Sequence, residues 1–269
     1  MLFLFYVCLG ILCCTKNVLS SLTFLKPTHL ESKIVGGEEV SANSIPYMAG
    51  LFITKPSGLY LCGGVLISTK YVLTSANCLE SSTSVEVRLG AHKVNQEEST
   101  QVRLTSTQFN IHGDWNSTSL TNDIATILLP SAITPNNYIK PVSLPGRADK
   151  DTTFSGEWAV VSGWGRDSDA ANSMSQVLRS VDVEIMSNAN CIFYYGTYVT
   201  PGHICTSGVD GVGSCRGDSG GPLIFDDQLI GIVSFASSAG CEVGWPTAYT
   251  RVTSYFEWIE NHSDVVINK

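Results

Sequence analysis

Three polar residues lie in settings that could support chemistry. Ser219 lies inside the glycine-rich run 217–222 (GDSGGP), Asp123 opens the apolar run 124–129, and Asn77 directly precedes Cys78. A serine hydroxyl is a weak nucleophile until a neighbouring base removes its proton. Glycine lets the backbone approach a substrate closely, in conformations that other residues avoid. The pattern therefore indicates nucleophilic attack by Ser219, provided that a base is present.

The segments around these residues resemble the catalytic segments of the trypsin/chymotrypsin serine proteases. They read YVLTSANC at 71–78, TNDIA at 121–125 and GDSGGP at 217–222, in that family's chain order of histidine, aspartate and serine. The resemblance covers residues 34–269. It implies that Ser219 is the nucleophile, that Asp123 is the buried carboxylate that orients the base, and that Asn77 replaces the histidine. The backbone N–H groups of Gly217 and Ser219 would form the oxyanion hole.

An asparagine at position 77 cannot do the work of an imidazole. Imidazole takes up and returns a proton near neutral pH, whereas an amide has donors and an acceptor but no basic lone pair. The histidines of the chain are His29, His92, His112, His203 and His262. None has the family's spacing from Cys78, although a bound peptide could bring a histidine of its own. We expect proteolysis to be absent or severely impaired, with a binding or regulatory role. The alternative is an active serine-type endopeptidase.

The resemblance also implies a narrow substrate-binding pocket. Its positions are Gly213 at the base, Ser234, Phe235 and Ala236 on the edge strand, and Thr247 on the wall. A substrate backbone would pair with that edge strand. The base carries no acidic residue, so a preference for lysine or arginine is not expected. Ala236 and Thr247 are bulkier than glycine and favour small or medium apolar side chains. The run 234–252 also resembles arthropod chymotrypsin- and collagenase-like enzymes.

Short apolar or alternating runs, broken by Gly, Pro, Asn and Ser, are typical of many short strands in a barrel or sandwich. These runs are 47–53, 59–67, 85–89, 124–129, 158–163, 177–185 and 229–235. Apolar residues at helical spacing predict one C-terminal helix from about Thr253 to Asn261. The segment 140–151 is the best candidate for a crossover between two halves. The resemblance implies an all-β fold of two six-stranded antiparallel β-barrels with the active site between them.

Two N-terminal segments are expected to be removed. Residues 1–14 are nearly all apolar but fewer than the roughly 20 that a membrane span needs. They predict a signal peptide over about 1–20 and hence secretion. A propeptide over 21–33 then ends in a segment, SKIVGG at 32–37, that resembles the family's zymogen cleavage site. A trypsin-like protease would cut after Lys33, and the freed amine of Ile34 would pair with Asp218. A buried carboxylate is costly unless a cation reaches it.

The cysteine count agrees with a secreted chain. Three of the nine cysteines leave with the leader, and an even number in a secreted protein implies disulfides. The zinc alternative lacks a CxxC pair or a histidine at ligand spacing. The family resemblance implies the pairs Cys62–Cys78, Cys191–Cys205 and Cys215–Cys241. Two glycosylation patterns place N-glycans on Asn116 and Asn261.

The net charge of the chain limits the classes of molecule that it is expected to bind. The formal net charge of −8 argues against nucleic acid and against an anionic membrane. The partners expected are a peptide or protein ligand in the cleft and an activating trypsin-like protease. No cofactor and no metal are expected, and the chain is expected to be a monomer.

Overall fold

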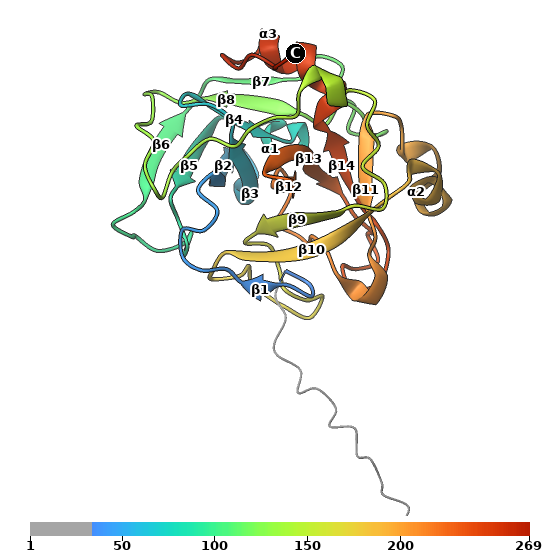
Figure 1. The fold of residues 1–269 in the computed structure, drawn as a ribbon. Helices are drawn as coiled ribbons and strands as arrows, with labels where there is room; N and C mark the ends of the chain where they lie inside the picture. Colours follow the sequence, from blue (N-terminus) through green and yellow to red (C-terminus); the bar gives the residue numbers. More distant parts are fainter. Residues whose placement is uncertain (1–33) are drawn as a thin grey trace, which may run out of the picture. The chain divides into compact units, whose positions relative to one another are not determined.

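The computed structural model describes residues 34–269, so the predicted signal peptide, propeptide and Lys33 lie outside the described residues. The described part is built from two antiparallel sheets with few helices (Figure 1). The first sheet comprises β2 (Met48–Lys55), β3 (Gly58–Leu66), β4 (Tyr71–Thr74), β5 (Ser84–Leu89), β6 (Val102–Ser106), β7 (Phe109–Ile111) and β8 (Ala125–Leu128). The second comprises β1 (Glu38–Glu39), β9 (Trp158–Gly163), β10 (Arg179–Met186), β11 (His203–Thr206), β12 (Pro222–Phe225), β13 (Gln228–Phe235) and β14 (Thr247–Arg251).

The first sheet closes on itself as a six-stranded barrel. Its order, β6-β5-β2-β3-β4-β8-β7, begins and ends with two strands that are separated in the chain by residues 107–108 alone. Leu128 donates its backbone N–H to the Gln108 carbonyl at 2.9 Å, so pairing with β8 continues through this break. β6 and β7 therefore act as one interrupted strand.

The second sheet is also a closed six-stranded barrel. β10 pairs with β11 on one side and with β9 on the other, which joins the ends of the order β10-β11-β14-β13-β12-β9. The seventh strand, β1, is an addition at the edge, where Glu38 and Glu39 pair with β10. The expected pair of six-stranded antiparallel barrels is confirmed.

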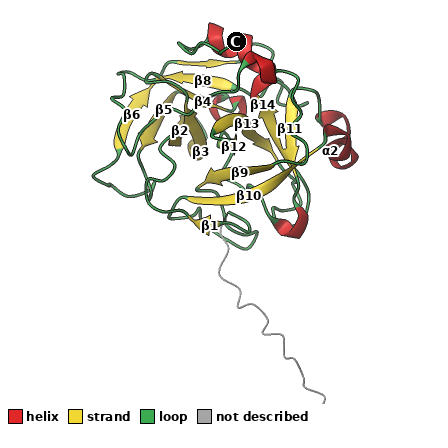
Figure 2. Cartoon of the chain, in the orientation of Figure 1, coloured by secondary structure: helices red, strands yellow, loops and turns green. Residues whose placement is uncertain are grey.

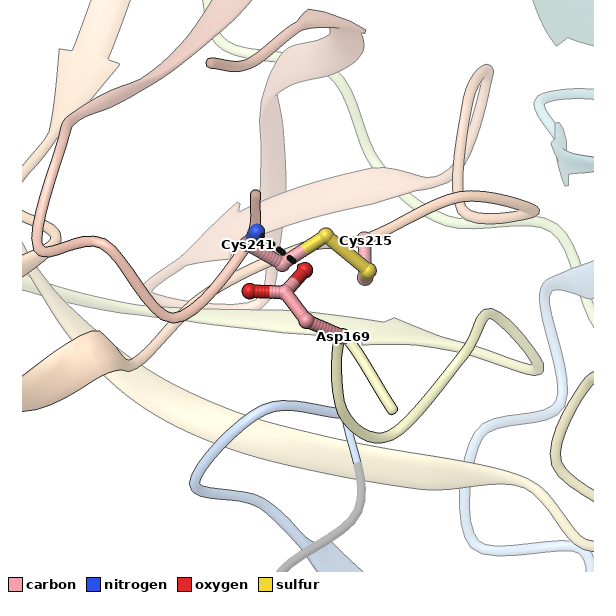
Figure 3. A group of neighbouring side chains, drawn as sticks. All are labelled: Asp169, Cys215 and Cys241. Atoms are coloured by element: carbon pink, nitrogen blue, oxygen red, sulfur yellow. Dashed lines mark hydrogen bonds between the residues drawn. A yellow bond between two sulfur atoms is a disulfide. The ribbon is translucent and has the colours of Figure 1, made fainter. Parts of the chain in front are cut away.

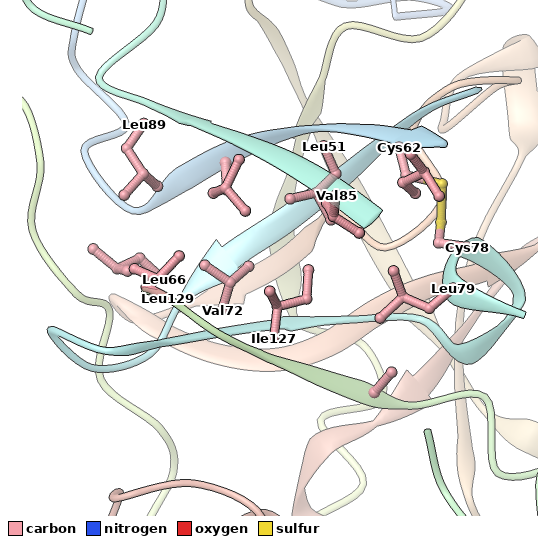
Figure 4. Close-up of a cluster of buried hydrophobic side chains, with 14 of the residues drawn as sticks. Leu51, Cys62, Leu66, Val72, Cys78, Leu79, Val85, Leu89, Ile127 and Leu129 are labelled. Atoms are coloured by element: carbon pink, nitrogen blue, oxygen red, sulfur yellow. A yellow bond between two sulfur atoms is a disulfide. The ribbon is translucent and has the colours of Figure 1, made fainter. Parts of the chain in front are cut away.

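Alternation of side chains explains how each barrel obtains a core. In β5 the residues Val85, Val87 and Leu89 are fully buried, whereas Glu86 and Arg88 are partly exposed. Successive side chains of a strand point to opposite faces, so this sequence buries one face only. The inward face joins residues of the neighbouring strands and the disulfide Cys62–Cys78 in the core of the first barrel (Figure 4).

A further apolar cluster joins the two barrels. It contains Val65 of β3 and Ile124, which precedes β8, together with Leu229 and Ile232 of β13 and residues of the C-terminal helix. Because residues from both sheets share this cluster, each barrel is fixed against the other by burial of apolar surface. The connection between the barrels runs from 129 to 157, which includes the expected crossover 140–151.

Helices are few in the described part of the chain (Figure 2). They are α1 (Ala76–Leu79), α2 (Asn188–Tyr195), α3 (Phe256–Asn261) and the 3₁₀ turns η1 (Arg147–Asp149), η2 (Gly196–Tyr198), η3 (Val209–Gly211) and η4 (Val252–Tyr255). The predicted C-terminal helix is present, but its first turn is the 3₁₀ turn η4. His262, just beyond α3, accepts a hydrogen bond from Thr126 of β8, so the C-terminal helix reaches the first barrel.

The structure forms the three disulfides that the family resemblance implied, Cys62–Cys78, Cys191–Cys205 and Cys215–Cys241. Each of the seven runs expected to be strands coincides with a strand, namely β2, β3, β5, β8, β9, β10 and β13. Within residues 34–269, none of the helices is both long and apolar enough to cross a bilayer.

Candidate active site

Asn77 and Asp123 form the centre of the site. Asn77 lies in α1, directly after β4, and Asp123 lies in the turn that leads into β8. The Asn77 backbone N–H donates to Asp123 Oδ1 at 2.8 Å, and Nδ2 donates to Oδ2 at 2.7 Å. Nδ2 also lies 3.4 Å from the Ser234 carbonyl oxygen. Because both neighbours of the amide nitrogen are acceptors, the orientation of the Asn77 amide is fixed.

The second barrel completes the surroundings of Asp123. Ser234 of β13 donates its hydroxyl to Asp123 Oδ2 at 2.6 Å, and Thr250 of β14 donates to the Asp123 carbonyl oxygen at 2.6 Å. Asn122 holds a left-handed backbone with φ of 58°, which turns Asp123 inward. The carboxyl is only 1% exposed. Burial raises the pKa of Asp123 to about 6, although the hydrogen bonds from Ser234 and Asn77 oppose the shift.

The loop that carries Ser219 depends on two glycines. Gly217 has φ of 102°, and a Cβ there would lie 2.6 Å from Met174 Sδ. Gly220 has φ of 80°, and a Cβ there would lie 2.1 Å from Thr74 Oγ1. Both the backbone conformation and the space exclude a larger residue. Ser219 itself is anchored to the first barrel, because its carbonyl oxygen accepts the Gly63 N–H at 2.8 Å.

The backbone of this loop leaves two donors free. The N–H groups of Asp218, Gly220 and Gly221 each donate to a backbone carbonyl. Those of Gly217 and Ser219 donate to no acceptor within residues 34–269. These are the two N–H groups that the sequence assigned to an oxyanion hole, and a carbonyl oxygen of a ligand would satisfy them.

The hydroxyl of Ser219 has no side-chain partner in the part of the chain that the structure describes. The described histidines are bonded elsewhere: His92 to Glu39, His112 to the Asp114 N–H, His203 to the Leu120 carbonyl and His262 to the Trp258 carbonyl. Burial lowers the pKa of both His112 and His203. None of these four rings is placed to act on Ser219. His29 lies outside the described residues.

A cavity of about 340 Å³ opens beside Ser219. Three of the expected pocket residues, Ser234, Phe235 and Ala236, belong to its lining. The other two, Gly213 and Thr247, are not among its lining residues, and their place in the pocket stays a prediction. Gly213 is buried and pairs with Val35, and the adjacent Ser214 lines the cavity. Thr247 is 3% exposed and lies behind Ser214, whose hydroxyl is 3.3 Å from Thr247 Oγ1.

The cavity wall is also shaped by an acidic residue that the sequence analysis missed. Asp169 lies against the disulfide Cys215–Cys241, and its Oδ1 accepts the Cys241 N–H at 2.7 Å (Figure 3). One carboxylate and two cysteines have metal-ligand spacing here. Both sulfurs are bonded to each other, however, so neither is the thiolate that binds a metal.

Residues 34–37 dock beside the serine loop. Ile34 is fully buried, and the Val35 carbonyl accepts the Gly213 N–H at 3.0 Å. Asp218 is fully buried too, and its carboxylate accepts backbone N–H groups from Gly165 at 2.7 Å and Cys215 at 2.9 Å. Burial raises the pKa of Asp218 to about 6. The two predicted glycosylation residues, Asn116 and Asn261, are exposed.

The structure places Asn77 and Asp123 in direct contact, and it shows several contacts that the sequence did not predict. The Ser234 hydroxyl and Thr250 hold Asp123 from the second barrel across more than 100 residues of chain. Arg166 and Arg216, which line the cavity, were also missed. Arg216 lies one residue before the 217–222 motif, so its proximity to Ser219 was the available signal.

Comparison with known proteins finds one family. The trypsin family model matches residues 34–259. The chain is 46% identical to brachyurin of Leptuca pugilator, over 86% of this chain and 99% of that protein. It is 38% identical to a chymotrypsin of Phaedon cochleariae, over 86% of this chain and 83% of that protein. Among solved structures, HL collagenase is similar with a TM-score of 0.80 and 34% identity, over 87% of this chain and 100% of that one.

Proposed function

Because this chain belongs to the trypsin family of serine proteases, we propose that it binds peptide or protein ligands in its cleft and is inactive or severely impaired as a protease. The observation that carries the proposal is the contact between Asn77 Nδ2 and Asp123 Oδ2, at 2.7 Å. An amide occupies the place beside Asp123 where the family's histidine is expected. The Ser219 hydroxyl is left without a base in the described part of the chain.

The size of the expected loss in turnover decides whether the protein acts as an enzyme or as a binding protein. Removing the histidine of a serine-protease triad lowers turnover on the order of 10⁶-fold. That corresponds to roughly 8 kcal/mol of barrier. An oxyanion hole and substrate binding alone leave roughly 10³–10⁴-fold acceleration over water. The free N–H groups of Gly217 and Ser219 would then serve to hold a ligand carbonyl rather than to speed its hydrolysis.

We propose that the protein is secreted as a precursor and is cut after Lys33 by a trypsin-like protease. The buried Asp218 carboxylate receives only neutral backbone donors from the described residues. The freed amine of Ile34 would supply the cation that such a carboxylate lacks. The exposure of Asn116 and Asn261 is compatible with N-glycans in a secreted protein.

Labelling with a serine-directed organophosphonate tests the proposal. Protein cut after Lys33 is incubated with the reagent, and the label on Ser219 is followed by mass spectrometry. We expect no labelling of the wild type and clear labelling of Asn77→His. The double variant Asn77→His/Ser219→Ala is the matched control and should stay unlabelled. Rapid labelling of wild-type Ser219 would instead establish the alternative, an active serine-type endopeptidase. Failure of Asn77→His to label would show that Asn77 is not the cause of the defect.

A further inference from the structure

The cavity beside Ser219 contains two arginines on adjacent segments. The Arg166 N–H donates to the Arg216 carbonyl at 2.8 Å, so the two residues are joined through their backbones. Both residues line the cavity, and Arg216 directly precedes Gly217 of the serine loop. A Cβ on Gly217 would lie 3.0 Å from the Gly165 Cα, which places Arg166 against the same loop. Two arginine residues therefore flank the proposed ligand site.

From this arrangement we propose that the cleft selects a peptide that carries an aspartate or glutamate side chain, bound by Arg166 and Arg216. The inference rests on the proposed peptide-binding function and names the class of ligand. A guanidinium presents its donors in a planar fork that matches a carboxylate, and such charge-assisted hydrogen bonds are stronger than neutral ones.

The guanidinium groups are available for a ligand. Neither Arg166 nor Arg216 takes part in an ion pair within residues 34–269, whereas Arg88 pairs with Glu86 and Arg147 with Glu260. Arg166 Nε is buried and has no hydrogen-bond partner in the described part of the chain. A buried donor without a partner is costly, and a ligand oxygen would remove that cost.

The carboxylates near the cavity are already occupied. Asp169 accepts N–H groups from Cys241 at 2.7 Å and from Glu242 at 3.1 Å (Figure 3). Glu242 in turn accepts the Asp169 N–H at 2.7 Å. These bonds hold both acidic side chains on the backbone of the wall. The arginines are donors only, so their guanidinium groups can donate to a carboxylate of a ligand.

The rest of the lining is mixed, with the apolar residues Val233, Phe235, Ala236 and Ala239 beside four serines. Ser168, Ser214, Ser237 and Ser238 line the cavity together with the arginines and Asp169. An apolar side chain entering this cavity would remove water from hydroxyl and charged groups without replacing their hydrogen bonds. The part of the lining formed by the arginines and serines thus favours an acidic side chain over the small or medium apolar side chain that the sequence suggested.

Peptide binding to the full chain, before and after the cut at Lys33, tests the inference. A seven-residue peptide of alanine and serine is scanned with glutamate, one position at a time, and the best position is then changed to Gln, Leu or Lys. Affinity is measured by calorimetry at low and high salt. We expect the Glu peptide to bind on the order of tenfold more tightly than the Gln peptide, and the advantage to shrink at high salt.

Variants assign the effect to the arginines. Arg216→Gln and Arg166→Gln should each bring the Glu-to-Gln ratio toward one, and Asp169→Asn should raise it. The matched control is Arg103→Gln, an exposed arginine of β6 outside the cavity lining, which should leave the ratio unchanged. Circular dichroism checks that each variant is folded. Equal binding of Glu and Gln peptides, or a ratio unaffected by Arg216→Gln, would overturn the inference and leave peptide binding intact. Absence of binding by every peptide would overturn the proposed function itself.

Discussion

Two buried aspartates, Asp123 and Asp218, differ in how the fold accommodates their charge. Burial raises the pKa of each to about 6. Asp123 receives hydrogen bonds from side chains of both barrels, those of Asn77 and Ser234. Asp218 receives only backbone N–H groups among the described residues, from Gly165 and Cys215. One carboxylate is held by neutral side chains, and the other is the one proposed to pair with the amine of Ile34.

Because their partners differ, different chemical changes would alter the charge of Asp123 and that of Asp218. Asn77 is a neutral partner of Asp123, so a base at this position of the chain requires a substitution. Asp218 is different, because a single backbone cut after Lys33 would create an amine near it. Cleavage after Lys33 and the presence of a base beside Ser219 are therefore separate requirements, and each can be tested without the other.

The largest effect is expected from Asn77→His. An imidazole at this position would hydrogen-bond Asp123 and accept the Ser219 proton, so hydrolysis of peptide substrates should rise on the order of 10⁴- to 10⁶-fold. The rate should increase with pH around the imidazole pKa, near about 6.5. Initial rates with chromogenic peptides across pH 5–9 measure both properties. Asn77→Gln keeps an amide and should gain nothing. If the wild type hydrolysed these peptides as fast as Asn77→His, the absence of a base beside Asp123 would not limit catalysis, and the contrast with Asp218 would disappear.

The next largest effect is expected in the pH dependence of the unfolding free energy of the uncut protein. The pKa of each buried aspartate, about 6, exceeds the ordinary value of 3.8, so the folded state retains protons that the unfolded state has released. Their contribution is therefore most favourable below about pH 4 and is lost as the pH rises through about 6. The loss is about 3 kcal/mol for each group, at about 1.4 kcal/mol per pKa unit. Urea unfolding at pH 4.5 and 7.5 measures it.

The two contributions can be separated. Asp123→Asn and Asp218→Asn should each flatten the pH dependence of the unfolding free energy by about half. Cleavage after Lys33 should act on Asp218 only, because the Ile34 amine would lower the pKa of that carboxyl. Cut Asp218→Asn protein should then have the same pH dependence as uncut Asp218→Asn protein. An unchanged slope in cut wild-type protein would contradict pairing between Ile34 and Asp218.

A smaller effect is expected from Ser234→Ala. This change removes the hydroxyl that donates to Asp123 Oδ2 at 2.6 Å and leaves the buried carboxylate with fewer partners. It should cost about 1–3 kcal/mol at pH 7.5, where Asp123 is ionised, and less at pH 5. Ser238→Ala, at an exposed serine of the same segment, is the control and should be close to neutral. An equal loss at both pH values would mean that the Ser234 hydroxyl does not support the charge of Asp123.

The sequence predicted what is local and missed what depends on distant neighbours. β5 was recognisable because Val85, Val87 and Leu89 alternate with polar residues, and the serine loop was recognisable from its glycines. The Ser234 hydroxyl was not assigned to Asp123, because 111 residues separate them and their contact depends on how the barrels pack. The contact between the Ser214 hydroxyl and Thr247 Oγ1, at 3.3 Å, likewise joins residues that are far apart in the chain.

The same reasoning applies to the strand count. The break between β6 and β7 and the pairing of Glu38 with β10 follow from strands elsewhere in the chain, so alternation could not reveal them. Motifs that resemble a family fixed the positions of Asn77, Asp123 and Ser219, because those residues lie in short contiguous segments. Arg166 and Arg216 belong to two segments that meet only in the folded chain, and no single motif contains both.

The smallest effect is expected from Lys55→Gln, and it sharpens the claim that Asp123 lacks a cation. Lys55 is half-buried, and its Nζ lies 3.2 Å from the Asn77 carbonyl oxygen and 5.4 Å from the centre of the Tyr60 ring. The ammonium group thus contacts the backbone of Asn77 and not the Asp123 carboxylate. Removing it should change the unfolding free energy by about 0.5 kcal/mol or less, equally at pH 5 and 7.5. A loss confined to pH 7.5 would mean that Lys55 compensates the charge of Asp123, and the two aspartates would then differ less than their hydrogen bonds indicate.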